Sequence, residues 1–85
     1  MARIKTKTGF EIELDSEILD DMETFEILVD IDKGEMKRLP DLLQRTLSED
    51  QKKALYEHCR VDGRVKLSSV LNEMSQIFEE LGGKK

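Results

Sequence analysis

The sequence predicts a mainly α-helical (α+β) fold in which an N-terminal β-hairpin precedes about four short helices packed around one small core. Apolar and polar side chains alternate over residues 3–14, which is the period of a strand with one buried face. Beyond residue 15 the apolar side chains recur at helical spacing, with interruptions at Gly34, Pro40 and Gly63. A chain of 85 residues suffices for one domain, so we expect a hairpin over 1–14, a helical body over 15–81 and a flexible tail over 82–85.

The N-terminal hairpin is expected to turn at residues 7–9 and to bury Ile4, Phe10, Ile12 and Leu14 on one face. Basic side chains on its first strand and acidic ones on its second can pair across the ladder. Because two strands alone are marginally stable in water, the hairpin has to pack on the helices or on another chain. Its open edges also leave room for a strand from a partner.

The segment from Asp15 to Asp32 has a helical period, with Asp20 or Asp21 as its N-cap and Gly34 just past its C-terminus. At 3.6 residues per turn its apolar residues fall on two flanks. One flank holds Ile18, Met22, Phe25 and Val29, and the other holds Ile27, Leu28 and Ile31. A helix that is apolar over more than half of its circumference is either central in the core or half-covered by another chain. Both alternatives stay open.

Three more helices are expected. The second has Pro40 in its first turn and runs to about Leu47. Capping-box spacing from Ser48 to Gln51 begins a third helix that runs to about Arg60. Their expected buried residues are Leu39, Leu42, Leu43, Leu47, Ala54, Leu55 and either His58 or Cys59.

After a break at 61–65, residues 67–81 carry the most regular helical pattern in the chain. Its apolar stripe consists of Leu67, Val70, Leu71, Met74, Ile77, Phe78 and Leu81. Gly82 and Gly83 are expected to end this helix.

The net charge of −5 is unevenly distributed. Residues 11–35 carry eleven acidic side chains against Lys33 alone, whereas residues 36–66 have eight basic and five acidic side chains. The acidic first half can therefore pair with the basic middle, form a solvated face, or meet a basic partner. The acidic balance argues against nucleic acid and against an anionic membrane as partners, because both select clusters of Lys and Arg.

Motifs that would carry chemistry are weak, so we expect no enzyme, no cofactor and no metal site. His58 and Cys59 are adjacent in the sequence, and neighbouring side chains diverge on a helix, which makes them a poor nucleophile–base pair. A helix-turn-helix over 48–81 is disfavoured, because its reading helix holds Glu73, Glu79 and Glu80 but no basic residue. No apolar run approaches the roughly 20 residues that span a bilayer.

Short motifs follow one another in a definite order from Leu19 to Leu81. They are LDD at 19–21, DIDKG at 30–34, LPDLL at 39–43, LSEDQK at 47–52, LYEH at 55–58, DGRV at 62–65 and EMSQIFE at 73–79. In order and spacing they resemble the small tail assembly chaperones of long-tailed (siphovirus-type) bacteriophages and prophages, over about three-quarters of the chain. One departure is Ser48, where many relatives have Gly, and it affects only the local turn.

The resemblance implies a function and a set of partners. Members of this family bind the long, helical tape measure protein, keep it soluble before tail assembly and promote polymerisation of the tail tube around it. In many of these phages a −1 ribosomal frameshift adds an extension that recruits the tail tube protein, so this chain would be the short form of the pair. The implied location is the host cell cytoplasm and not the mature virion. Self-association stays open.

The residues predicted to contact the partner lie on the first and last helices. They are Ile27, Leu28 and Ile31 on one apolar flank, Glu23, Glu26 and Asp30 on the acidic stripe beside it, and Phe78 and Leu81 near the end that a longer form would extend. Two other classes of protein remain as alternatives. One is a small acidic helical adaptor or antitoxin-like inhibitor of a basic protein, and the other is a transcriptional regulator using residues 48–81.

Overall fold

The computed structural model describes residues 2–82. Its elements are β1 (Ala2–Lys5), β2 (Glu11–Leu14), the 3-10 helix η1 (Ser16–Asp20), α1 (Met22–Asp32), the 3-10 helix η2 (Met36–Arg38), α2 (Leu39–Thr46), α3 (Glu49–Cys59), β3 (Arg60–Val61), β4 (Arg64–Val65) and α4 (Leu67–Leu81). The predicted fold class, mainly helical with an N-terminal hairpin, is therefore confirmed. The predicted tail lies outside the described residues from Gly83 onward.

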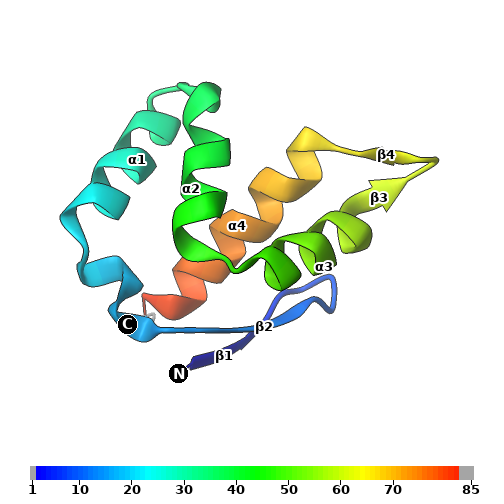
Figure 1. Cartoon of the computed structure of the whole chain (residues 1–85), viewed down its shortest axis with the longest axis horizontal. Helices are drawn as coiled ribbons and strands as arrows, with labels where there is room; N and C mark the ends of the chain where they lie inside the picture. Colours follow the sequence, from blue (N-terminus) through cyan, green and yellow to red (C-terminus); the bar gives the residue numbers. More distant parts are fainter. Residues whose placement is uncertain (1, 83–85) are drawn as a thin grey trace.

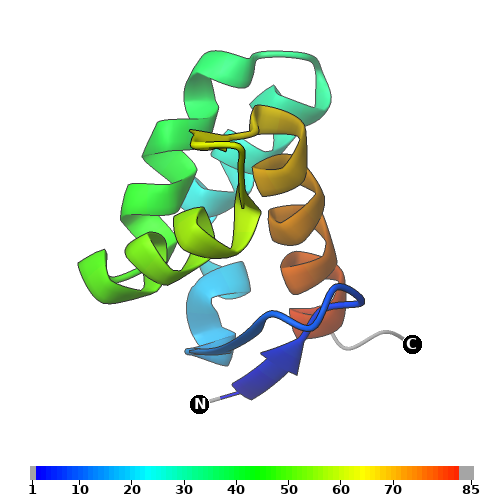
Figure 2. The same ribbon diagram turned by 90° about the vertical axis from the view of Figure 1, so that its right-hand side faces the viewer.

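The elements are spread along the longest axis of a molecule that measures 36 × 27 × 24 Å. At one end α1 contacts α2, and in the middle α4 contacts α3 (Figure 1). The β3–β4 hairpin projects at the end opposite α1 (Figure 1). The β1–β2 hairpin lies beneath the helices, where β1 contacts α4 (Figure 2).

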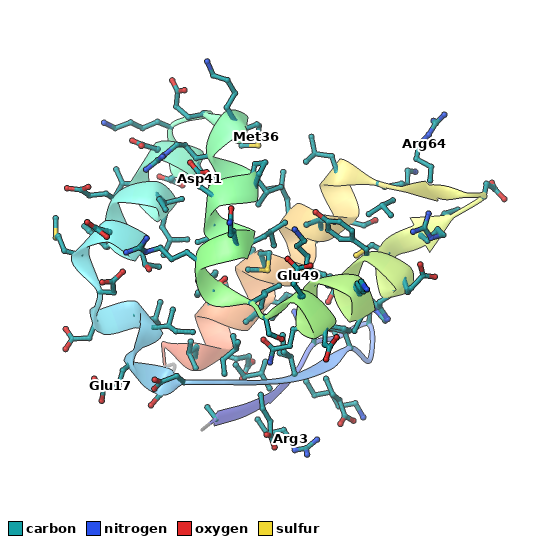
Figure 3. All side chains as sticks on the ribbon, viewed as in Figure 1. Arg3, Glu17, Met36, Asp41, Glu49 and Arg64 are labelled. Atoms are coloured by element: carbon teal, nitrogen blue, oxygen red, sulfur yellow. The ribbon has the colours of Figure 1, made fainter. Side chains whose placement is uncertain are left out.

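The β1–β2 hairpin packs on the helices of its own chain. Its strands are antiparallel with Ile4 opposite Ile12, and the turn is closed by the Thr6 N–H, which donates to the Phe10 carbonyl at 2.8 Å. Gly9 supplies the positive φ, 95°, that this turn needs. On the outer face, Arg3 pairs with the carboxylates of the second strand at 3.1 and 3.2 Å (Figure 3). The expected charge pairing across the hairpin is thus confirmed.

The segment from Asp15 to Asp32 has the expected helical period and one of its two predicted N-caps, Asp21, but a separate 3-10 helix precedes α1. Residues 16–20 form η1, and Asp21 then adopts extended backbone angles (φ −116°, ψ 119°). In that conformation Asp21 is the N-cap of α1, and its carboxylate accepts from the Thr24 N–H. Gly34 follows the helix with φ 101°, as expected of a residue just past a helix C-terminus.

The second and third helices begin and end close to the predicted residues. Pro40 occupies the first turn of α2, where its missing N–H costs no hydrogen bond. Ser48 and Gln51 form the complete capping box of α3, each side chain accepting from the other's backbone N–H. Leu55 and Cys59, one turn apart, are buried, whereas Ala54 is exposed, so its predicted burial is wrong.

The predicted break at 61–65 is a small β-hairpin. Two-residue strands pair with Arg60 opposite Val65 and Val61 opposite Arg64. Both turn residues have positive φ, 54° at Asp62 and 77° at Gly63, which matches the right-handed twist of the strands. The α4 helix then covers the predicted range, but its first residue, Leu67, is 55% exposed and does not belong to the core.

One hydrophobic cluster joins the first hairpin to all four α-helices. Its most deeply buried side chains include Leu42, Leu55, Met74 and Ile77, each at most 2% exposed. Side chains such as Leu28, Leu71 and Phe78 are half-buried at the margin of this cluster. The margin, rather than the core, is where a partner can find apolar surface.

Candidate partner-binding groove

An open groove of about 570 Å³ lies between α1 and α4. Its floor comes from buried core residues, Leu39, Leu42 and Met74. Its walls include Leu28, Ile31 and Asp32 of α1 and Leu71, Phe78 and Glu79 of α4. We call this feature the α1–α4 groove.

The packing of the helices explains why this space stays open. α1 packs against α2 and η2, whereas α4 packs against α3 and β1. Both helices also contact η1, but their other neighbours differ, and their facing apolar side chains leave the groove open. Leu71, Met74 and Phe78 follow one stripe of α4 at i, i+3 and i+7, so one wall of the groove is apolar along two turns.

Three of the predicted contact residues come together in this groove. Leu28 and Ile31 approach from α1 and Phe78 from α4, although they are far apart in the sequence. Leu81 is half-buried against the core and does not line the groove.

Ile27 needs correction as a contact residue. It is 4% exposed and belongs to the core, because it faces α2 with Thr24 one turn before it. A partner cannot reach this side chain in the folded protein.

The flank of α1 that contains Met22 and Phe25 faces solvent, and the flank that contains Ile27 faces the core. Met22 is 64% exposed and Phe25 is 53% exposed. With Val29 they line a shallow hollow on the outer side of α1, beside Glu26. The buried side instead contains Thr24, whose hydroxyl donates to the Asp21 carboxylate at 2.7 Å and so can be buried without losing a hydrogen bond.

The acidic stripe of α1 is largely paired within the chain. Asp30 accepts from Arg38 at 3.1 Å, and Arg45 pairs with both Asp21, at 3.1 Å, and Glu23. The hydrogen bonds from the Thr24 hydroxyl and N–H and from Arg45 lower the pKa of Asp21, and the bond to Asp21 raises the pKa of Arg45. Two of the predicted contact residues, Glu23 and Asp30, therefore hold α1 to the basic segment after it.

A second polar cluster fastens the first hairpin to α3 and α4. Thr8 in the hairpin turn donates its hydroxyl to Glu73 at 2.6 Å and lies 2.8 Å from Nε2 of His58. Glu73 is 3% exposed, and its second oxygen has no hydrogen-bond partner. The neighbouring Cys59 is buried, and burial followed by the charge of Glu73 raises the pKa of its thiol. This cluster joins elements within the fold, and none of its side chains lines the α1–α4 groove.

Metal-binding and membrane-spanning features are not found in residues 2–82. No group of three or more His, Cys, Asp or Glu side chains in this range is placed to hold a metal ion. Across the same range, none of the helices has both the length and the apolar character required to cross a membrane.

Comparison of the chain with known proteins gives no relative. It matches no family model, no curated protein and no solved structure. The features of the molecule that point to a function are the α1–α4 groove and the order of motifs in the sequence.

Proposed function

We propose that this protein is a tail assembly chaperone of a long-tailed bacteriophage or prophage, which binds the tape measure protein, keeps it soluble and promotes polymerisation of the tail tube around it. The observation that carries the proposal is the α1–α4 groove, where Leu28, Ile31 and Phe78 form the accessible part of an apolar surface. An open groove with apolar walls accepts the apolar face of an amphipathic helix. A tape measure protein is long and helical, so it offers many such faces.

The small extent of the groove is consistent with reversible binding. The α4 wall of the groove runs only from Leu71 to Glu79, so it can hold a short helical segment, and small interfaces of this kind are typically weak or transient. Several copies along one long partner would raise the overall affinity through avidity. The growing tail tube can then displace each weak contact in turn, so the proposal requires no nucleotide hydrolysis.

The chain would be the short form of a frameshifted pair. Gly82-Gly83-Lys84 can be encoded as GGG-GGA-AAA, which contains the slippery heptamer G-GGA-AAA. A −1 shift there would extend the chain beyond α4, the helix that forms one wall of the groove. The nucleotide sequence tests this directly: codons that cannot slip, or no continuing −1 reading frame, would exclude the longer form.

The test of the proposal is co-expression with the tape measure protein encoded nearest to this gene. Ile31→Lys and Phe78→Lys place a charge in the groove and should lower the soluble fraction of the tape measure protein several-fold. Phe25→Lys is the matched control, because Phe25 is an exposed apolar residue of α1 outside the groove. The control should solubilise the partner as the wild type does.

Thermal unfolding of each variant separates binding from folding. Ile31 and Phe78 are half-buried, so a variant that keeps a cooperative transition but loses solubilisation supports the groove. If both groove variants fold and still solubilise the partner as well as Phe25→Lys does, the proposal is wrong.

A second candidate is an acidic adaptor or antitoxin-like inhibitor of a basic protein. It is favoured by Asp32 and Glu79, exposed acidic residues at the groove. Gene neighbourhood discriminates the two candidates. A gene between those for a tail tube protein and a very long coiled-coil-rich protein favours the chaperone, whereas an adjacent toxin gene favours the inhibitor.

A further inference from the structure

The α1–α4 groove carries acidic groups on both walls. Asp32 is the last residue of α1, Glu79 lies near the end of α4, and both side chains are exposed. Within residues 2–82 neither carboxylate forms an ion pair with a basic side chain. The groove therefore combines an apolar floor with negative charge that no basic side chain of residues 2–82 neutralises.

Two other acidic residues of α1 differ in this respect, whereas Glu26 forms no ion pair within residues 2–82 either. Glu23 and Asp30 are paired with Arg45 and Arg38, which come from α2 and the turn before it. Arg38 and Arg45 are therefore paired with carboxylates other than that of Asp32. Charges beside apolar walls are screened less by water than charges on an open surface, so Asp32 remains available to a cation from outside.

The length of the groove sets the length of its occupant. Its α4 wall runs from Leu71 to Glu79, which at 1.5 Å per residue is about 12 Å, or just over two helical turns. A partner helix of that extent offers apolar side chains at i, i+3 or i+4, and i+7. Lys and Arg beside such a stripe can lay their apolar stems along the walls and bring their charged ends to the carboxylates.

We propose that the α1–α4 groove selects about two turns of an amphipathic helix whose apolar stripe is flanked by Lys or Arg on both sides. The inference rests on the proposed function, because it takes this groove as the site that holds the partner. The charges beside the apolar stripe are what would let the groove discriminate among the many apolar faces of a long helical protein. Segments flanked by Glu or Asp are rejected, because they would meet Asp32 and Glu79 with like charge.

A second copy of this chain is a poor occupant by the same argument. Its exposed apolar face on α1 consists of Met22 and Phe25 beside Glu26. Docking that face would bring Glu26 towards the acidic rim formed by Asp32 and Glu79. For that face, the charge complementarity points to a basic partner and not to a second copy.

The experiment measures binding of three synthetic helical peptides to the full-length protein by fluorescence anisotropy. The peptides share one apolar stripe and differ only in flanking residues, which are Lys, Gln or Glu. Each has about 18 residues, because shorter isolated helices are marginal in water. We expect the Lys peptide to bind more tightly than the Glu peptide by roughly three- to ten-fold at low salt, and the difference to shrink at high salt.

Two double variants test whether the preference for the Lys peptide comes from the acidic rim formed by Asp32 and Glu79. Asp32→Asn with Glu79→Gln should bind all three peptides about equally. Glu49→Gln with Asp62→Asn removes the same charge from exposed positions that do not line the groove, and it should keep the preference for Lys. Equal affinities in the wild type, or a preference that survives the rim variant, would overturn the inference. So would self-association that Phe78→Lys abolishes, because the groove would then hold a second copy.

The peptide result and the co-expression result are separable. If the wild type solubilises the tape measure protein but binds the Lys and Glu peptides equally, the charge selectivity is wrong and the chaperone proposal stands. If the Lys peptide binds with the expected preference but no tape measure protein is solubilised, the groove chemistry stands and the proposed function fails.

Discussion

Asp21 shows how much a single side chain contributes to the candidate site. Its carboxylate accepts hydrogen bonds from the Thr24 N–H at 3.0 Å and the Thr24 hydroxyl at 2.7 Å, and it pairs with Arg45 at 3.1 Å. It therefore begins α1, allows Thr24 to be buried, and ties α1 to α2. These bonds act together with the Arg38–Asp30 pair and the buried Ile27 to position α1, and with it one wall of the groove.

The lowered pKa of Asp21 predicts a pH dependence of stability. Because the pKa in the folded protein lies below its unfolded value, the contribution of Asp21 is complete above the unfolded pKa. It is lost as pH falls through the folded pKa. Asp21→Asn keeps a good N-cap but loses the charge, so its thermal midpoint should fall less on acidification than that of the wild type. Identical acid profiles would show that the Asp21 charge does not contribute.

Thr8 is predicted to be essential for the attachment of the first hairpin. It donates to the buried carboxylate of Glu73, whose other oxygen already lacks a partner. Thr8→Val removes the donor and should lower the free energy of unfolding by about 1–3 kcal/mol, measured by urea denaturation. Thr8→Ser keeps the hydroxyl and should stay close to wild type. Equal losses in both variants would mean that the methyl group, and not the hydrogen bond, matters.

At the scale of elements, most of the fold was predictable because local signals agree with tertiary packing. The capping box at Ser48, Pro40 in the first turn of α2 and the regular stripe of α4 each fix a boundary within the sequence itself. The small β3–β4 hairpin was missed, although Asp62-Gly63 is a strong signal for a two-residue turn. Its strands are only two residues long, so alternation could not reveal them.

The orientation of α1 was not predictable from its own sequence. Both flanks have helical spacing, and a hydrophobic pattern alone favours burying Phe25 and Met22. The structure buries Thr24 and Ile27 instead, because Asp21 satisfies the Thr24 hydroxyl and Arg45 on α2 attracts the acidic residues nearby. The orientation of α1 therefore depends in part on Arg45, which is more than twenty positions from Asp21 in the sequence. The hydrophobic periodicity of α1 alone contains no information about that contact.

This orientation predicts opposite results for two substitutions in α1. Ile27→Ala should lower the free energy of unfolding by about 2–5 kcal/mol, because it leaves a cavity in the core. Met22→Ala, at a side chain that is 64% exposed, should change it by less than about 0.5 kcal/mol. Denaturant unfolding measures both values. A larger loss at Met22 than at Ile27 would mean that α1 faces the other way.

At the scale of the whole molecule, the uneven charge of the sequence has two outcomes. Part of the acidic first half is neutralised by Arg38 and Arg45 of the basic middle, as the sequence suggested. Asp32 and Glu79 are left beside apolar walls on α1 and α4. Sequence periodicity identified Ile27, Leu28 and Ile31 as one apolar flank of α1, of which Leu28 and Ile31 line the groove. It could not identify Asp32 and Glu79 as groove residues, because the groove exists only once α1 and α4 are placed.

The most direct test of the central claim is to map where a tape measure fragment touches this protein. Backbone amide shifts of the ¹⁵N-labelled chain, followed during titration with an amphipathic tape measure segment, report the contact surface residue by residue. The groove predicts that the largest changes fall at residues 28–32 and 71–79, and that the tip of the β3–β4 hairpin changes little. Changes centred on Met22 and Phe25, or along the edges of the β1–β2 hairpin, would contradict it.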